Sequence, residues 1–101
     1  MEKKVWEGRI ATVGKVLAPL MVDRRIGPVH VCLYLAIWQC GERQARNGWM
    51  MIRREELMRL AKISGRTTYY RVMGDLARWG YIGYRPSLYK RQRSRARINQ
   101  A

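Results

Sequence analysis

The sequence is short of the residues on which most enzymes depend. It has one histidine and seven acidic residues among 101 positions, and Glu55 and Glu56 form the only adjacent pair of carboxylates. The histidine, His30, falls on a predicted buried helix without a serine or cysteine partner, which is more typical of a packing residue than of a catalytic base. No glycine-rich phosphate loop is present. We therefore expect no catalysis and no cofactor.

Cysteine is equally scarce, with two residues in the chain, Cys32 and Cys40. On one helix, eight positions would place them about 12 Å apart, beyond the roughly 7 Å limit for a disulfide. Neither His30 nor Cys32 is joined by further ligands at the spacing that zinc requires. The sequence therefore predicts buried, reduced thiols and neither a disulfide nor a metal site.

Long apolar runs and linkers are absent as well. No stretch reaches the roughly 18 apolar residues that a membrane span needs. The first ten residues include the acidic Glu2 and Glu7 and no continuous apolar stretch, unlike a secretory signal. We find no repeat and no Ser/Gly/Pro-rich segment. Because 48% of the residues are hydrophobic, we expect residues 1–101 to form one cytoplasmic domain with its own core and no membrane contact.

Positive charge is what the sequence has in excess. Twenty-one Lys and Arg face seven acidic residues, a net charge of +14, and sixteen of the basic residues are arginine. Residues 1–52 hold eight basic and four acidic groups (net +4), and residues 53–101 hold thirteen and three (net +10). Such a field attracts a polyanion, and arginine favours phosphates and guanine edges. Charge therefore predicts a nucleic-acid partner without choosing between DNA and RNA.

Apolar periodicity in the first half predicts two helices and a strand. The first helix covers residues 8–22, with Pro19 expected to kink or shorten it. The second covers residues 28–45, where Pro28 suits the first turn. Residues 49–52 are short, apolar and bounded by turn residues, as in a strand. The inner face of the second helix is expected to carry Val31, Tyr34, Leu35 and Trp38, widened by Cys32, Leu33 and Ile37.

The second half predicts two short helices and a hairpin. One helix covers residues 53–63, with its acidic residues in the first turn, where the helix dipole favours them. The next covers residues 65–79 and ends at Gly80, which can adopt a left-handed conformation. Two strands follow within residues 81–99. The order of elements is that of a winged helix-turn-helix, a mostly α fold with a small β-hairpin wing.

The helix over residues 65–79 carries the first candidate site. Its inner face is expected to hold Tyr69, Val72, Met73 and Leu76, which leaves polar residues outside near its start. Arginine and hydroxyl groups at a helix N-terminus suit the major groove of DNA. Asp75 and Arg78, further along, are expected to lie in solvent, and Ser64 or Gly65 to cap the helix. The predicted DNA contacts are Ser64, Gly65, Arg66, Thr67, Thr68, Tyr70 and Arg71.

The hairpin carries the second candidate site. Arg95 and Arg97 alternate with Ala96 and Ile98, so that the arginines face outward while the apolar side chains pack inward. Such a wing would lie along a phosphate backbone or insert an arginine into the minor groove. The predicted wing contacts are Arg85, Lys90, Arg91, Arg93, Arg95 and Arg97.

Three segments resemble a family of small winged-helix proteins carried on conjugative transposons and related mobile elements of gut bacteria. The segments are HVCLY (30–34), AKISGRTTYYRVMGDL (61–76) and GYIGYRPS (80–87). The resemblance implies a winged-helix fold and DNA binding, with roles in regulating transcription, excision or transfer of the element. By position, Thr67, Thr68 and Tyr69 match the family's recognition-helix motif, and Tyr81, Tyr84 and Pro86 match the start of its wing.

The wing turn departs from the family pattern. Where family members often carry Asn-Pro and then Gly-Ser, this chain has Tyr89-Lys90 and Arg93-Ser94. We expect a longer and more basic wing instead of the tight turn.

The leading prediction is sequence-selective binding of double-stranded DNA by a nucleoid-associated regulator or mobile-element accessory factor, acting in excision, transfer or replication. An RNA- or ribosome-associated module would use the same positive field, as would a non-specific architectural DNA binder. Preference for structured RNA over duplex DNA at equal salt would favour the RNA alternative. A third possibility is an interaction protein whose first helix docks on a partner or forms a homodimer.

Overall fold

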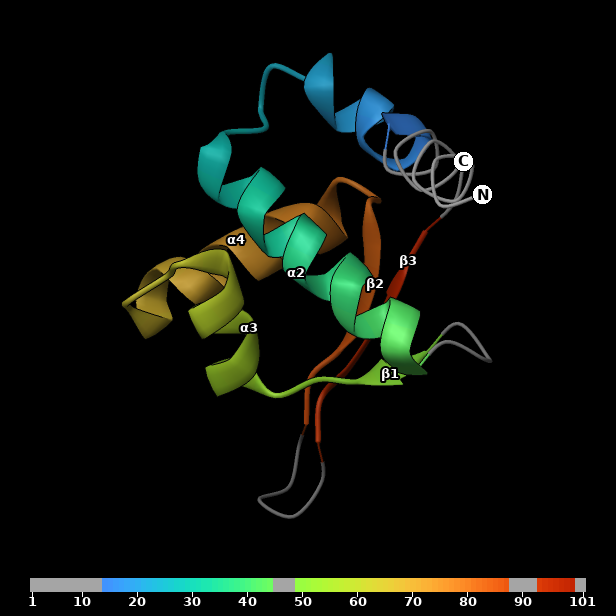
Figure 1. Cartoon of the computed structure of the whole chain (residues 1–101). Coiled ribbons are helices and arrows are strands. Elements are labelled where there is room, and N and C mark those ends of the chain that lie inside the picture. Colours follow the sequence, from blue (N-terminus) through green and yellow to red (C-terminus); the bar gives the residue numbers. More distant parts are fainter. Residues whose placement is uncertain (1–13, 45–48, 88–92, 100–101) are drawn as a thin grey trace, which may run out of the picture.

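The computed structural model describes residues 14–44, 49–87 and 93–99. Within them the chain is mostly helical and carries a small three-stranded antiparallel sheet (Figure 1). Residues 14–21 are helical. The elements that follow are α2 (Pro28–Gln44), β1 (Met50–Met51), α3 (Arg54–Ala61), α4 (Arg66–Arg78), β2 (Ile82–Arg85) and β3 (Arg95–Ile98).

This order of elements is the one expected from the sequence, and the boundaries within the described residues agree to within two positions. Residues 8–13 and 45, expected to be helical, lie outside the described residues. The first helix is seen over residues 14–21 with Pro19 inside it, and α2 begins at Pro28, as predicted. A proline suits that position because the first N–H groups of a helix have no partner within it.

The end of α3 comes earlier than expected, at Ala61 instead of Ile63. Lys62 takes a left-handed conformation with φ 62°, the one non-glycine residue to do so in the described part of the chain. The Ile63 amide then donates to the Met58 carbonyl oxygen at 2.8 Å, which closes the helix end. Glycine is the residue that usually marks such a helix end, so the lysine gave no indication that the helix ends here.

The start and end of α4 match the prediction more closely. Gly65 occupies the N-cap position and contributes no side-chain hydrogen bond. At the other end Gly80 adopts φ +84°, and the Tyr81 amide donates to the Leu76 carbonyl oxygen at 2.9 Å. Glycine accepts this conformation without steric cost, which ends the helix and leads directly into β2.

The sheet has the order β1-β3-β2, so β3 lies in the middle. Ala96 of β3 faces Met50 of β1 and Tyr84 of β2, and all three point toward the helices. Paired residues share a face of an antiparallel sheet, so Arg95 and Arg97 lie on the other, outer face. The expected alternation of β3 is confirmed, with Arg95 and Arg97 exposed and Ala96 fully buried.

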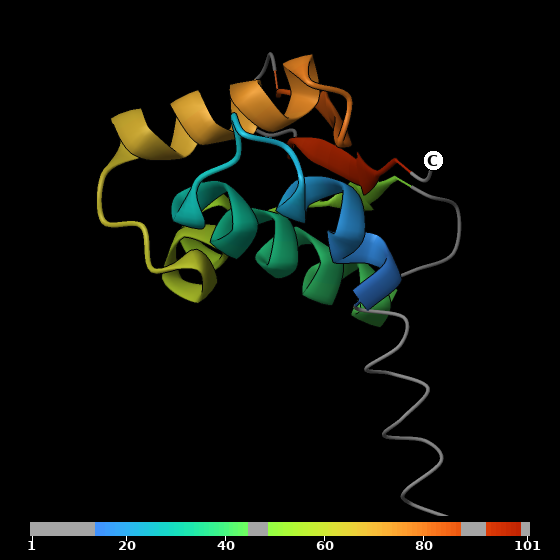
Figure 2. The same cartoon turned by 90° about the horizontal axis from the view of Figure 1, so that it is seen from above.

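The core lies between α2, α3, α4 and the inner face of the sheet. In Figure 1, α2 runs across the sheet, and in Figure 2, α4 runs along the opposite side of the molecule from α2. Residues 14–21 lie beside the end of the hairpin at which β2 begins and β3 ends, since Val16, Tyr81 and Ile98 line one groove. The most deeply buried side chains are Leu20, Leu33, Ile37, Leu57, Tyr69, Val72, Met73, Leu76 and Ile82.

The buried face of α2 differs from the expected one. Leu33, Tyr34, Ile37 and Cys40 are buried, whereas Cys32 is exposed, so the expectation of two buried thiols is wrong for Cys32. Apolar residues occupy nearly every position of this helix from Pro28 to Trp38, and periodicity therefore does not select one face. Within the described residues, no helix is long and apolar enough to cross a membrane.

Candidate nucleic-acid interface

The two faces of α4 differ as the sequence predicted. Tyr69, Val72, Met73 and Leu76 are each at most 2% exposed and pack into the core. On the opposite side the first half of the helix presents polar and cationic side chains. The exposed members of the predicted set are Ser64, Gly65, Arg66, Thr67, Tyr70 and Arg71, and Thr68 is half-buried.

Arg66 and Arg71 remain available to an external anion. Arg66 makes no hydrogen bond or ion pair with any of the described residues, although its charge acts at a distance on the Glu55 carboxyl of α3. Arg71 has a 58% exposed side chain and only a distant contact, 3.9 Å from Nη1 to Asp75 Oδ2. Exposed arginines of this kind keep most of their N–H donors free for a phosphate or a guanine edge.

Tyr70 is held in place by a residue that the sequence analysis missed. Its hydroxyl accepts a hydrogen bond from Arg54 Nη1 at 2.9 Å, and its ring meets that of Tyr69 edge-on at 5.1 Å. Arg54 is the first residue of α3 and also pairs with Glu55 at 3.1 Å. This contact fixes the exposed phenol between the two helices. A hydrogen bond across 16 positions leaves no local pattern in the sequence.

The second half of α4 corrects a prediction. Asp75 was expected in solvent but is buried, because its carboxylate accepts hydrogen bonds from His30 of α2 and from Arg78. His30 Nε2 lies 2.9 Å from Asp75 Oδ2, and His30 Nδ1 accepts from the Gly27 amide at 3.0 Å. Since an amide can only donate, Nε2 must carry the ring proton and donate to Asp75.

This pair joins α4 to α2. The hydrogen bond from His30 is the main reason that the pKa of Asp75 lies below its ordinary value, with Arg78 and Arg71 adding to the effect. His30 also packs against Trp79, with ring centroids 5.2 Å apart. His30 is 7% exposed, so its predicted burial is confirmed.

A second set of contacts holds the same end of α4 to the turn before α2. The guanidinium of Arg25 lies 4.7 Å from the centre of the Trp79 ring and pairs with Asp23 at 2.8 Å. The Tyr81 hydroxyl donates to Asp23 Oδ2 at 2.6 Å. These hydrogen bonds, from Arg25 first and Tyr81 second, hold the pKa of Asp23 below its usual range. The C-terminal end of α4 is therefore anchored.

The outer face of the sheet carries the second candidate site. Arg85 of β2 pairs in register with Arg95 of β3, and Gly83 with Arg97, so the three arginines share one face. All three are exposed, as is Arg93 just before β3. Lys90 and Arg91 lie outside the described residues. The structure thus brings three of the six predicted wing contacts to one face, while Arg93 lines a pocket beside Cys40, Ile52 and Glu56.

Trp49 belongs to this face as well, although the sequence analysis assigned it only to a strand. Its indole ring lies 4.1 Å from the guanidinium carbon of Arg85 and 4.9 Å from that of Arg97. A tryptophan followed by two methionines and an isoleucine predicts a strand of the core. The sequence does not indicate the contact with the arginines, because they come more than thirty positions later in the chain.

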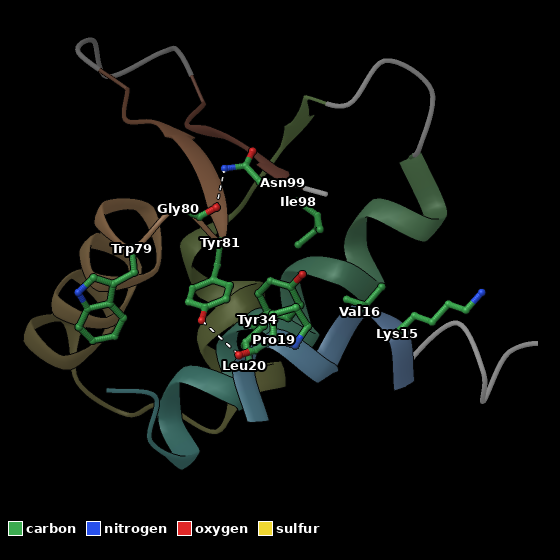
Figure 3. A pocket seen from close by; sticks show the side chains of 10 residues that line it. All are labelled: Lys15, Val16, Pro19, Leu20, Tyr34, Trp79, Gly80, Tyr81, Ile98 and Asn99. Atoms are coloured by element: carbon green, nitrogen blue, oxygen red, sulfur yellow. Dashed lines mark hydrogen bonds between the residues drawn. The ribbon is translucent and has the colours of Figure 1, made fainter. Parts of the chain in front are cut away.

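A groove of about 570 Å³ lies at the other end of the molecule, beside residues 14–21 (Figure 3). Its lining is mainly apolar and includes Val16, Leu20, Tyr34 and Ile98. At the edge of the groove, the side-chain amide of Asn99 donates to the Gly80 carbonyl oxygen at 3.0 Å. None of the predicted contact residues lines this groove. It is therefore separate from both arginine-bearing surfaces.

No cluster of three or more histidine, cysteine or acidic side chains that could hold a metal ion occurs in the part of the chain that the structure describes. Comparisons with known proteins add no relationship: no protein-family model, no curated protein and no solved structure matches this chain. The function therefore has to be argued from the residues themselves.

Proposed function

We propose that the chain is a winged helix-turn-helix protein that binds double-stranded DNA sequence-selectively. In this proposal α3 and α4 form the helix-turn-helix, the first half of α4 enters the major groove, and β2 and β3 form the wing. The biological role follows the family resemblance of the sequence, as a regulator of transcription or an accessory factor of a mobile element.

The single observation that carries the proposal is the division of α4 into a buried apolar face and an exposed cationic face at its N-terminal half. Arg66 and Arg71 have free donors, and Thr67 and the anchored Tyr70 add hydroxyl groups beside them. Arginine can bond the O6 and N7 atoms of guanine with two parallel hydrogen bonds, while hydroxyls bond phosphates or base edges. A rigid helix that offers these groups together is suited to reading a base sequence.

The sheet supports the same proposal through charge. Arg85, Arg95 and Arg97 lie on the outer face of the sheet, whose strand β2 contacts α4. Arginines on a strand next to a groove-binding helix would meet the phosphate backbone that flanks the groove. In this arrangement α4 supplies the sequence selectivity and the wing supplies sequence-independent affinity.

The experiment that tests the proposal is selection from a random pool of duplex DNA, washed at about physiological salt, where unspecific phosphate contacts weaken steeply. We expect one enriched motif, and replacement of Arg66 or Arg71 by alanine should relax the preference at particular positions of it. A palindromic motif would indicate a dimer on paired half-sites.

Retention of DNA only at low salt, with no enriched motif, would contradict the proposal. Selection from a pool of structured RNA under the same wash is the matched comparison. Enrichment there and not in duplex DNA would assign the same basic surfaces to an RNA-binding module.

A further inference from the structure

The outer face of the sheet holds an aromatic ring between arginine side chains. Trp49 immediately precedes β1, is half-buried, and contacts the guanidinium groups of Arg85 and Arg97 through its ring, at 4.1 and 4.9 Å from the ring centroid. The two arginines come from different strands, β2 and β3, at positions two residues out of register. The ring therefore links β1 to both strands of the wing on the side away from the core.

Gly83 makes this arrangement possible. A Cβ atom at position 83 would lie 2.9 Å from Trp49 Cη2 and 3.1 Å from Arg97 Cγ, both closer than side chains normally approach. The absence of a side chain at this point of β2 lets the indole and Arg97 lie close to the strand. Glycine is otherwise unfavourable inside a strand, and close approach of another group is a common reason for it.

The contacts of the two guanidinium groups with the indole ring use none of their N–H donors. A guanidinium that packs against the face of an indole is attracted to it through its own face, so the N–H groups at its edge still point outward. Neither Arg85 nor Arg97 forms an ion pair with a carboxylate among the described residues. Both are therefore ordered by a contact that uses none of the donors needed for a phosphate.

We propose that Trp49 positions Arg85 and Arg97 as a pre-ordered pair that binds the phosphodiester backbone of the DNA duplex. This inference rests on the proposed function and identifies Trp49 as the residue that orders two arginines of the wing before DNA binds. Ordering a long side chain before binding removes part of the entropy cost of association. Trp49 itself is a positioning residue, and the two arginines make the contact with the phosphates.

Arg95 provides a matched comparison within the same surface. It lies on the same face of β3, two residues from Arg97, and is likewise exposed. Among the described residues it has neither an aromatic ring against it nor an ion pair. Trp49 should therefore affect DNA binding through Arg85 and Arg97 and not through Arg95.

The test is a set of double-mutant cycles on duplex binding at about physiological salt. With the arginines intact, Trp49→Ala should weaken binding about five- to tenfold, and Trp49→Phe, which keeps an aromatic face, should restore most of it. In an Arg85→Ala, Arg97→Ala background, Trp49→Ala should change the affinity less than twofold. In an Arg95→Ala background it should retain its full effect.

Gly83→Ala serves as the second variant, because its Cβ atom would crowd both the indole and the Arg97 side chain while leaving every charge in place. It should reproduce the weaker binding of Trp49→Ala. The structural readout is the NMR signal of the arginine Nε–H groups without DNA. Those of Arg85 and Arg97 should show upfield ring-current shifts that disappear in Trp49→Ala, whereas that of Arg95 should not change.

Four outcomes are informative. Equal effects of Trp49→Ala with and without the two arginines would overturn the inference, as would unshifted Nε–H signals in the wild-type protein. Wild-type protein that binds no duplex at this salt while showing the ring-current shifts would instead contradict the proposed function, and with it the phosphate-binding role of the pair. Coupling confined to Arg85 and Arg97 supports the inference.

Discussion

The two halves of α4 carry the same kind of side chain in different surroundings. In the first half, Arg66 forms no ion pair with a described residue and acts only at a distance on Glu55 of α3, and Arg71 has only a distant contact with Asp75. In the second half, Arg78 lies against Asp75, which His30 also binds from α2. One helix therefore has an end available to an external anion and an end held to the rest of the fold.

The difference lies in where the acidic residues are. A carboxylate within hydrogen-bond reach occupies a guanidinium, and burial of that carboxylate makes the contact part of the structure. Asp75 is the only acidic residue of α4, and it belongs to the second half. Arginine thus serves structure at one end of the helix and, in our proposal, recognition at the other.

The largest expected effect is on the anchored half. His30→Ala should lower the free energy of unfolding by about 3 kcal/mol, because it leaves the buried Asp75 carboxylate with one partner fewer and removes packing against Trp79. Urea denaturation measures this effect. Cys32→Ala, an exposed position two residues away in the same helix, should change it by less than about 0.5 kcal/mol. Equal effects of the two substitutions would show that the buried pair does not anchor α4.

The next effect concerns the exposed half. Arg66→Ala or Arg71→Ala should weaken binding to the selected duplex by about 1–3 kcal/mol, because each removes contacts to base edges or nearby phosphates. Fluorescence anisotropy titrations of the selected and a scrambled duplex measure it. Arg78→Ala, whose guanidinium is occupied by Asp75, should have little effect on affinity. A loss for Arg78→Ala as large as for Arg66→Ala would remove the distinction between the two halves.

A smaller effect is expected at the contact between α3 and α4. Tyr70→Phe removes the hydroxyl that accepts from Arg54 and should weaken duplex binding by about 1 kcal/mol. Because this hydrogen bond is exposed, the free energy of unfolding should fall by less than about 0.5 kcal/mol. Parallel binding and denaturation measurements separate the two. A larger loss of stability than of affinity would assign Tyr70 to the fold instead of the interface.

The smallest expected effect is that of a change of pH near neutrality on the stability of the fold. The pKa of Asp75 is held below its ordinary value by His30, and that of Asp23 by Arg25. Carboxyls whose pKa is lower in the folded than in the unfolded chain stabilise the fold above the unfolded value, and this stability is lost as pH falls through the folded value. Thermal melts should therefore be flat from pH 7 to about pH 5 and fall below about pH 4. Asp75→Asn should reduce that acid sensitivity, and an unchanged acid transition would contradict the assignment.

Local signals in the sequence predicted the elements well. Pro28 and Gly80 mark a helix start and a helix end through their own backbone preferences, and the apolar spacing of α4 identified its buried face. Such signals depend on residues a few positions apart. They failed at α2, where apolar side chains surround the helix, and at Lys62, which adopts a conformation that its residue type disfavours.

The candidate site was predictable only in its exposed parts. Arg66, Arg71, Arg95 and Arg97 could be assigned from periodicity alone, since each lies opposite an apolar face. The contacts of Asp75 and Trp49 could not be, because Asp75 meets a histidine 45 positions earlier and Trp49 meets arginines of the later hairpin. Contacts between distant elements depend on how the elements pack, and no local pattern records them.

The position of β3 in the sheet also sets an order of events during synthesis of the chain. β1 and β2 each pair with β3 and not with each other, so neither has a hydrogen-bonded neighbour until residues 95–98 have left the ribosome. The helices can pack earlier, because their contacts join segments made before that point. A chain in which the helices have packed but β3 has not inserted would therefore leave the edges of β1 and β2 that face β3 without hydrogen-bonding partners. Those two open strand edges are where such an intermediate would pair with another molecule.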